Sequence, residues 1–516
     1  MYESRIRRTG IVDLGSNTAR LVVFAYEPGH WFRLIDEIRE PVRLGESLGR
    51  SGKMSAAGME RAAAALRLYA KYCQAMELED VRVIATSAVR DAANREEFLE
   101  MVRPYGLPIE VLPGEEEAAL GVSAVANGFP MDDAWVMDLG GGSMQISRMR
   151  ERTFVDGRAF PLGAVRVYES FLSADPPSDP EVEALESRAE AELNETVGRM
   201  RRESFPLVAM GGSIRNLTRA VQKKNDYPLD RIHGFFLQRG ELETITYKLL
   251  HLRASQRSRV PGIHPDRGDI IVAAALVYRW LLRQTDRDGI WVSGQGVREG
   301  AFYKIFLPAP HWVSDIRSFS VRNLFAQFPQ SEFHTQQVRR LALRLFQELD
   351  PLHKLSQRDA ELLEAACWLH DIGMTLGYHD HHKHGAYLVE SFNLNGFTHR
   401  EQALLALLVR YHRKGKPKWK RLKALARPGD KRKLLQLSCC LRLAEFLERS
   451  RSGRVRDVKA RISGKKVAIA LVGHENPFIE LWETRKQSEL FQQAFKKKLT
   501  LDYEKQRTPA SAAPRR

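Results

Sequence analysis

Cysteine is scarce in this sequence, with four residues in 516. Cys439 and Cys440 are neighbours, which disfavours simple pairing, so a disulfide framework is excluded and a reducing cytoplasm is expected. Long apolar runs are also missing, because no stretch approaches the roughly 18 residues that a membrane helix needs. The longest run, Ile270 to Leu282, contains Arg279 and predicts a buried core helix, so no membrane span is expected.

Acidic residues are much fewer than basic residues in the C-terminal part of the chain. Residues 311–516 hold 39 Lys and Arg residues against 21 Asp and Glu residues, whereas residues 1–310 hold 41 against 43. The net charge of +16 therefore comes from the C-terminal part. This asymmetry favours an anionic partner there, such as a polyphosphate chain, a nucleic acid or a membrane surface, although basic residues also serve solubility alone.

Residues 1–310 alternate short β-branched runs with helical segments, which is typical of an α/β fold. The triplet Asp13-Leu14-Gly15 returns 125 residues later as Asp138-Leu139-Gly140, again between two predicted strands. The repeat predicts two domains of one fold facing each other across a cleft. After Pro310 the pattern changes to long amphipathic helices. We expect α/β domains at 1–124 and 125–310, a helical domain at 311–450, a small α+β domain at 451–507 and a disordered tail at 508–516.

The glycine-rich turns suit phosphate binding. Glycine lets the backbone approach a ligand closely, and successive N–H groups can then bind an anion. Asp13 and Asp138 would place carboxylates beside such a phosphate, where they could hold Mg²⁺. One such turn alone would be read as a hairpin, but two copies and a third turn predict a phosphate cleft. The expected phosphate-binding residues are Ser16, Asn17, Thr18, Gly141, Gly142, Ser143, Gly211 and Gly212.

Two further features belong with this cleft. Arg90 directly follows a predicted strand and could make a forked contact to phosphate, or a surface ion pair with Asp91 or Glu96. Glu115, Glu116 and Glu117 begin a predicted helix, where acidic residues are favourable for the helix dipole alone. Water attack on phosphorus requires a base within reach, and one of these three glutamates is the natural candidate.

The motifs GIVDLGSNTARLVVF, ATSAVRDAANREEFL, LPGEEEAALGV, VMDLGGGSMQIS, MGGSIRNL and SGQGVREG occur in one order over about 300 residues. In this order they resemble the Ppx/GppA family of exopolyphosphatases and guanosine pentaphosphate phosphohydrolases. The resemblance implies two ribonuclease-H-like domains around a cleft, as in actin, sugar kinases and heat-shock ATPases. It also implies a homodimer and hydrolysis of a terminal phosphoanhydride with Mg²⁺, or alternatively Mn²⁺.

Carried over by position, the resemblance makes Glu117 the catalytic glutamate, which would also contact the metal. Asp138, with Asp13, would hold the metal, and Arg90 would grip phosphate. The family pattern Gly-Gly-Gly-Ser-x-Glu is broken at Gln145. An amide cannot act as a base and is a weaker Mg²⁺ ligand than a carboxylate, so reduced activity or an altered metal arrangement is expected.

The helical part contains His370-Asp371 on a predicted helix, with further histidines up to His412. The order resembles the HD phosphohydrolase domain, which long exopolyphosphatases carry in a degenerate form. His334, His370 and Asp371 match its metal ligands, and Glu445 falls where an aspartate is usual. A structural or polyphosphate-guiding domain is favoured over a second hydrolase.

Residues 411–433 hold eleven basic residues and one acidic residue. Generic nucleic-acid binding fits this composition, but no DNA- or RNA-reading motif accompanies it, so nucleic acid is not expected. A track that feeds polyphosphate to the cleft is favoured over a solvated basic face. The track residues are Lys416, Lys418, Lys420 and Arg421.

The sequence therefore predicts a cytoplasmic, Mg²⁺-dependent exopolyphosphatase. A guanosine pentaphosphate phosphohydrolase of the same family is the alternative enzyme. A non-hydrolytic polyphosphate or nucleotide sensor is an alternative of another class, motivated by Gln145 and Glu445. An ATP-using kinase would need a nucleotide pocket, for which Gly211-Gly212 is the one hint.

Overall fold

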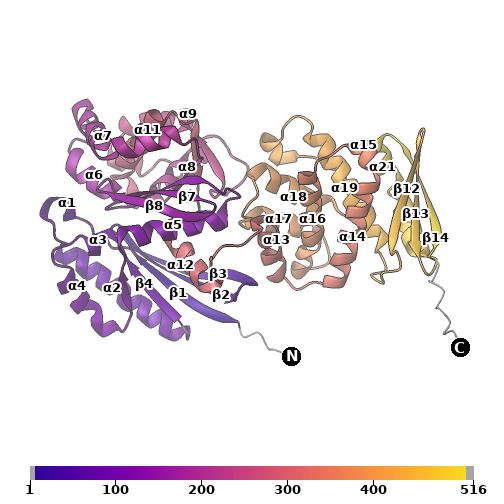
Figure 1. The fold of residues 1–516 in the computed structure, drawn as a ribbon, viewed down its shortest axis with the longest axis horizontal. Coiled ribbons are helices and arrows are strands. Elements are labelled where there is room, and N and C mark those ends of the chain that lie inside the picture. Colours follow the sequence, from indigo (N-terminus) through magenta and orange to yellow (C-terminus); the bar gives the residue numbers. More distant parts are fainter. Residues whose placement is uncertain (1–5, 79, 507–516) are drawn as a thin grey trace. The chain divides into compact units, whose positions relative to one another are not determined.

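The computed structural model describes residues 6–78 and 80–506, without the side chain of Arg50, so the tail predicted at 508–516 lies outside the described residues. The chain forms two compact units, Met1–Ile316 and Arg317–Arg516 (Figure 1). Within the described residues, no helix is both long enough and apolar enough to cross a membrane.

The first unit begins with a five-stranded sheet in the order β3-β2-β1-β4-β5. β1 pairs antiparallel with β2 and parallel with β4, so the hairpin lies beside a parallel crossover. Leu21 and Val23 of β2 join a core beneath α2, while Phe24 faces the other way and stacks on Phe302 of α12. Both faces of the sheet are therefore covered, which explains the continuous apolar run of β2. The elements are β1 (Arg7–Leu14), β2 (Thr18–Glu27), β3 (Trp31–Pro41), α1 (Leu48–Ser51), α2 (Ala56–Ala75), β4 (Asp80–Ala85), α3 (Ser87–Arg90), α4 (Arg95–Val102) and β5 (Ile109–Val111).

A second, six-stranded sheet follows in the order β10-β11-β9-β6-β7-β8. β6 pairs antiparallel with β7 and parallel with β9, as β1 does with β2 and β4. The two Asp-Leu-Gly turns thus occupy equivalent places in two sheets of matching topology, as the repeat predicts. Ile270 to Leu282 lies almost wholly in the buried helix α11, also as predicted. The elements are β6 (Ala134–Leu139), β7 (Met144–Arg150), β8 (Thr153–Phe160), α6 (Ala164–Phe171), α7 (Asp179–Arg202), β9 (Leu207–Met210), α8 (Gly212–Lys224), β10 (Phe235–Gln238), α9 (Arg239–Leu250), α10 (Ala254–Arg257), α11 (Ile271–Thr285) and β11 (Gly289–Val292).

Two helices connect the sheets. α5 (Gly114–Gly128) packs on β6, β7 and β8, and α12 (Val297–Phe306) returns to β1 and β2 of the first sheet. They also pack on each other so closely that a Cβ at Gly300 would lie 1.9 Å from the Leu120 carbonyl oxygen. The domain boundary expected between residues 124 and 125 therefore falls inside α5, a helix that packs on the second sheet.

The second unit is mainly helical and ends in a three-stranded sheet in the order β12-β13-β14. The long central helix α19 packs against α14, α16 and α18, and also against α20 and α21 from the C-terminal end. The segment expected as a small separate domain thus packs on the helices before it. The elements are α13 (Ile316–Ala326), α14 (Glu332–Glu348), α15 (Asp350–His353), α16 (Gln357–Leu369), α17 (His381–Ser391), α18 (His399–Tyr411), α19 (Asp430–Leu447), β12 (Asp457–Ser463), β13 (Lys466–Gly473), α20 (Phe478–Arg485), α21 (Ser488–Phe495) and β14 (Lys498–Lys505).

The aromatic contact between α12 and the first sheet generates a stability prediction. Phe302 is 1% exposed, and its ring lies 4.1 Å from that of Phe24 and 5.4 Å from that of Phe306. Phe302→Ala should lower the free energy of unfolding by about 3–5 kcal/mol, because it removes buried area and leaves a cavity. Urea unfolding followed by circular dichroism measures this loss. Tyr247→Ala, at a 66% exposed position, is the control and should change stability by less than about 0.5 kcal/mol.

Candidate functional site

A cavity of about 120 Å³ opens in the first unit where the turns of its two sheets meet. Its walls come from the β1–β2 and β6–β7 turns, the segment after β4, and the first turns of α5, α8 and α12. Nearly all of the predicted cleft residues are among those that line it. The lining includes Asp13, Ser16, Asn17, Thr18, Arg20, Ser87, Glu117, Asp138, Gly141, Ser143, Gly211, Gly212, Arg215, Arg267 and Arg298.

The two repeated turns touch each other at the cavity. The Ser16 hydroxyl lies 3.1 Å from that of Ser87, and a Cβ at Gly142 would lie 2.7 Å from both oxygens. Glycine leaves both hydroxyls in place at this point of contact, whereas a larger residue would force them to move. The Asn17 amide nitrogen is buried, and no group in the described residues accepts a hydrogen bond from it. A buried donor of this kind calls for an acceptor from a ligand.

Three carboxylates face the cavity. Burial raises the pKa of Asp13, and burial together with the Asp13 charge raises the pKa of Asp138 to about 6. Burial also raises the pKa of Glu117 to about 7, although the ion pair with Arg90 opposes this shift. The oxygens are hard donors that suit Mg²⁺, and a cation would relieve the repulsion between Asp13 and Asp138. The residues therefore fit a magnesium ion, although in the described structure the three carboxylates do not form one compact set of ligand atoms.

Arg90 lies beside Glu117 and outside the described lining of the cavity. Its Nη1 donates to Glu117 Oε2 at 2.9 Å and to the Leu112 carbonyl at 2.9 Å, while its Nε lies 3.3 Å from Asp91 Oδ1. The structure thus brings together the predicted arginine and the predicted base, and it also contains the ion pair with Asp91. In this arrangement Arg90 orients the Glu117 carboxylate.

Four further arginines, which the sequence did not single out, line the cavity: Arg20, Arg215, Arg267 and Arg298. Arg215 donates to the carbonyls of Gly211 and Gly294, which fixes its direction. Burial and neighbouring arginines lower the pKa of Arg20 and of Arg267 to about 10. Crowded cations of this kind favour a polyanion. Arg215 and Arg298 lie inside MGGSIRNL and SGQGVREG, so the signal was available, whereas no local motif marks Arg267.

A second cavity of about 390 Å³ continues from the first. The two share Arg20, Gly212, Arg215 and Arg267, and the second adds Arg39 and Arg219. Ile232 and Ile263 supply apolar wall beside these cations. We call this space the arginine recess.

Gln145 lies on β7 directly opposite Asp138 on β6. Its side-chain amide is buried and donates to the Ser143 hydroxyl at 2.8 Å. Gln145 is outside the described lining of the cavity, so in this structure it positions Ser143. A glutamate could not donate this hydrogen bond.

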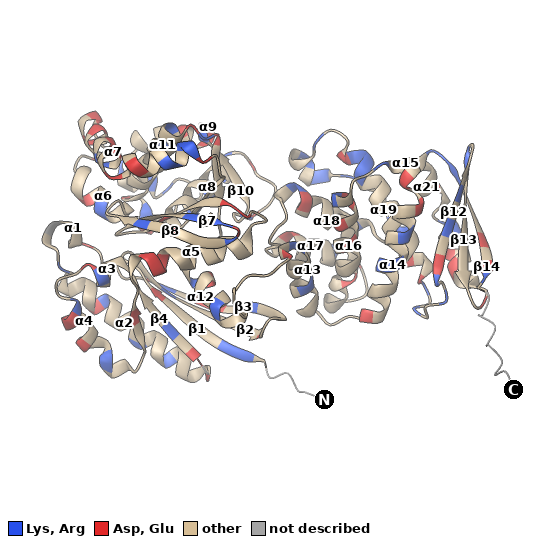
Figure 2. Ribbon diagram, viewed as in Figure 1, with Lys and Arg blue, Asp and Glu red and all other residues tan. Residues whose placement is uncertain are grey.

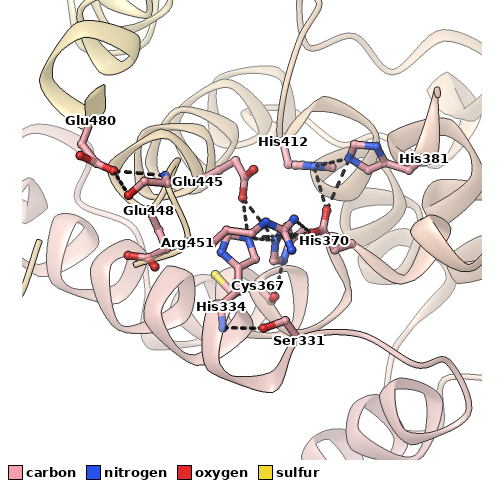
Figure 3. A network of polar contacts seen from close by, with 12 residues as sticks. Ser331, His334, Cys367, His370, His381, His412, Glu445, Glu448, Arg451 and Glu480 are labelled. Atoms are coloured by element: carbon pink, nitrogen blue, oxygen red, sulfur yellow. Dashed lines mark hydrogen bonds and ion pairs between the residues drawn. The ribbon is translucent and has the colours of Figure 1, made fainter. Parts of the chain in front are cut away.

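The four residues predicted for a pocket in the helical unit come together, and all are buried. His334 Nε2 lies 3.1 Å from Glu445 Oε2 and 3.3 Å from His370 Nε2, and Figure 3 shows these side chains converging. The expected placement of the His370-Asp371 pair on a helix is wrong by a short margin, because α16 ends at Leu369. His381 and His412 join the cluster on its other side, next to Asp371 Oδ1.

The basic segment 411–433 is exposed at Lys416, Lys418 and Lys420, which are among the residues drawn blue in Figure 2. Arg421 is exposed as well and pairs with Glu390. Trp419 is 7% exposed and anchors the segment in the unit's core, so its ring is not free to stack on a ligand.

The raised pKa of Glu117 predicts a pH-dependent stability. The Glu117 carboxyl has an ordinary pKa of 4.5 and a pKa of about 7 in the folded protein. Between these two pH values the folded protein therefore binds the carboxyl proton more tightly than the unfolded chain does. Ionisation of Glu117 therefore lowers stability as the pH rises through that window. Glu117→Gln should be more stable than the wild type at pH 8, by up to about 3 kcal/mol, and the gain should be much smaller at pH 5.

Urea unfolding at both pH values measures the effect. Glu116→Gln is the matched control, because Glu116 is exposed on the same helix turn, and it should change stability little at either pH. An equal gain for Glu117→Gln at pH 5 and pH 8 would contradict the assignment.

Both units of the chain are similar to known proteins. The Ppx/GppA phosphatase family model matches residues 22–308, and the model for domain III of Ppx/GppA phosphatases matches residues 316–493. An Aquifex aeolicus family member is 29% identical, with a TM-score of 0.49, over 58% of this chain and 97% of that one. An exopolyphosphatase from Cytophaga hutchinsonii is 20% identical, with a TM-score of 0.54, over 58% of this chain and 98% of that one. The first unit has the predicted fold of two ribonuclease-H-like domains around a cleft, and the chain belongs to the Ppx/GppA phosphatase family.

Proposed function

We propose that this phosphatase is an exopolyphosphatase, which hydrolyses the terminal phosphoanhydride of inorganic polyphosphate and releases orthophosphate. The observation that carries the proposal is the cationic lining of two continuous cavities. The first ends at the glycine turns and the unpartnered Asn17 amide, where a terminal phosphate would lie. The arginine recess would then take the phosphates that follow, because Arg215, Arg219 and Arg267 could pair with phosphate oxygens there. Arg20 and Arg39 also line it, and they pair with Glu37 and Asp266.

Asp13 and Asp138 would hold the magnesium ion, and Mn²⁺ is an alternative with similar oxygen preference. When bound, the cation would offset negative charge on the phosphate oxygens. Glu117 remains free for proton transfer, because Arg90 holds one of its oxygens from outside the cavity lining.

The reaction then follows from the residues of the cavity. Glu117 accepts a proton from water while the water oxygen bonds to the terminal phosphorus, and the bond to the bridging oxygen breaks. The bridging oxygen leaves with the shortened chain. The arginines and the N–H groups of the glycine turns stabilise the charge that develops on the phosphoryl oxygens. Arg90 keeps the Glu117 carboxylate oriented, and its positive charge favours the ionised form needed for proton acceptance.

Hydrolysis of guanosine pentaphosphate is a second candidate, favoured by one observation. Ile232 and Ile263 give the arginine recess an apolar wall that a guanine base could contact. A polyphosphate chain would leave that wall unused.

A cytoplasmic location accompanies the proposal, supported by four cysteines that are all unpaired and buried. A homodimer stays a prediction from the family resemblance.

The test measures orthophosphate release, with Mg²⁺, from long-chain polyphosphate and from guanosine pentaphosphate in parallel. Glu117→Gln should lower the rate by about 10²- to 10⁴-fold, because the base is lost, while polymer binding persists. Glu116→Gln should keep full activity. Release from the nucleotide alone would favour the second candidate, and tight polymer binding without any release would favour a sensor.

The basic segment generates a separate prediction. Neutralising Lys416, Lys418, Lys420 and Arg421 together should weaken binding of long-chain polyphosphate more than of short-chain polyphosphate, because long chains can contact more distant cations. Binding at two chain lengths and two salt concentrations measures the effect. Equal losses at both lengths would count against a polyphosphate track. The matched control neutralises four basic residues of the terminal sheet, namely Arg461, Lys465, Lys466 and Lys498.

A further inference from the structure

The surface of α17 in the helical unit combines exposed tyrosines with exposed cations. Tyr387 is 65% exposed on this helix, and Tyr378, in the loop just before it, is 51% exposed. Lys383 is also exposed, and it lies on the same face as Tyr387 because residues four apart in a helix are neighbours. Single exposed aromatic side chains need no partner, so the interpretation depends on what lies beside these two.

The basic segment 411–433 contacts both ends of this helix. Lys414 Nζ lies 3.4 Å from Asp380 Oδ1 at the start of α17, and Arg421 pairs with Glu390 near its end. These two contacts are about 15 Å apart along the helix axis, and Tyr387 lies between them in the helix. The segment between Lys414 and Arg421 therefore runs beside the helix, and it exposes the predicted track residues Lys416, Lys418 and Lys420.

Arginines hold the first tyrosine in place. Arg413 Nη2 donates to the Tyr378 hydroxyl at 2.7 Å, and the central carbon of its guanidinium lies 5.0 Å from the ring centroid. Hydrogen bonds from Arg413 and Arg449 also lower the pKa of Tyr378. The Tyr378 ring is therefore held in one direction beside a planar cation. Aromatic rings and guanidinium planes are the surfaces on which proteins stack nucleobases.

We propose that this face, formed by Tyr378, Tyr387 and the basic segment, binds single-stranded nucleic acid. Unpaired bases stack on the tyrosines, and the lysines contact the phosphates of the strand. Inorganic polyphosphate carries the same kind of charge but has no apolar surface, so it would leave the tyrosines unused. A duplex fits less well, because its bases are already stacked on one another. This binding does not rest on the proposed polyphosphatase activity.

The sequence alone does not lead to nucleic acid, because the basic segment carries no recognised reading motif. Its tryptophan, Trp419, is buried and cannot stack on a base. The aromatic side chains come instead from α17 and the loop before it, which precede the basic segment in the chain. The ion pairs of Lys414 and Arg421 with α17 bring the two parts together.

The test titrates the full-length protein into a fluorescently labelled single-stranded RNA of about 15 nucleotides and follows binding by fluorescence anisotropy. Tyr378→Ala and Tyr387→Ala should each raise the dissociation constant about 5- to 100-fold, because each removes one stacking surface. Tyr387→Phe should bind like the wild type, because the ring is retained. Tyr247→Ala is the matched control, because Tyr247 is equally exposed on a helix of the first unit, and it should not change binding.

Two further polymers separate stacking from charge. An RNA duplex of the same sequence should bind more weakly than the single strand, and binding of long-chain polyphosphate should be unchanged in Tyr387→Ala. Failure of the wild type to bind either the RNA strand or the DNA strand of the same sequence would overturn the proposal, as would equal binding by Tyr387→Ala and Tyr247→Ala. An equal loss of RNA and polyphosphate binding in Tyr387→Ala would assign this face to polyphosphate instead.

Discussion

The contact between the two repeated turns is the constraint on which the cavity of the first unit depends. Each turn follows a strand of a different sheet, and they meet with the Ser16 side chain against the backbone of Gly142. A side chain at that glycine would press on the Ser16 and Ser87 hydroxyls, so both hydroxyls would have to move. Because the turns touch, donors and carboxylates from both domains face one small volume, and a phosphate group there would be contacted from two sides.

The same geometry explains the uneven charge of the first unit. The unit is close to neutral over residues 1–310, yet six of its arginines line the cavity and the arginine recess. Three carboxylates lie among them, and burial keeps those groups from ionising readily. The cavity therefore crowds carboxylates together and arginines together. A metal ion beside the carboxylates and a polyanion beside the arginines would reduce both repulsions. The helical unit presents a contrast, because its buried charges form a compact cluster around Asp371.

The sequence allowed the fold of the first unit to be predicted because its signals are local. Asp13 and Asp138 lie next to last in the buried strands β1 and β6, and the Gly-rich turns after these strands are short, so the placement of both carboxylates follows from strand and turn rules alone. Arg267 and the return of α12 to the first sheet could not be predicted in this way, since both depend on contacts between distant segments. Glu445 illustrates the same limit, because its fit beside His334 depends on how α14 packs against α19.

The return of α12 also constrains how the chain can fold during synthesis. Phe302 fills the aromatic face of the first sheet against Phe24 and Phe32, residues made some 270 positions earlier. Until α12 has left the ribosome, that face of the sheet exposes β2 and β3 aromatic side chains to water. The first domain therefore completes its core only after the second domain has been synthesised. A chain that ends before α12, which begins at Val297, leaves these aromatic side chains exposed and prone to aggregation.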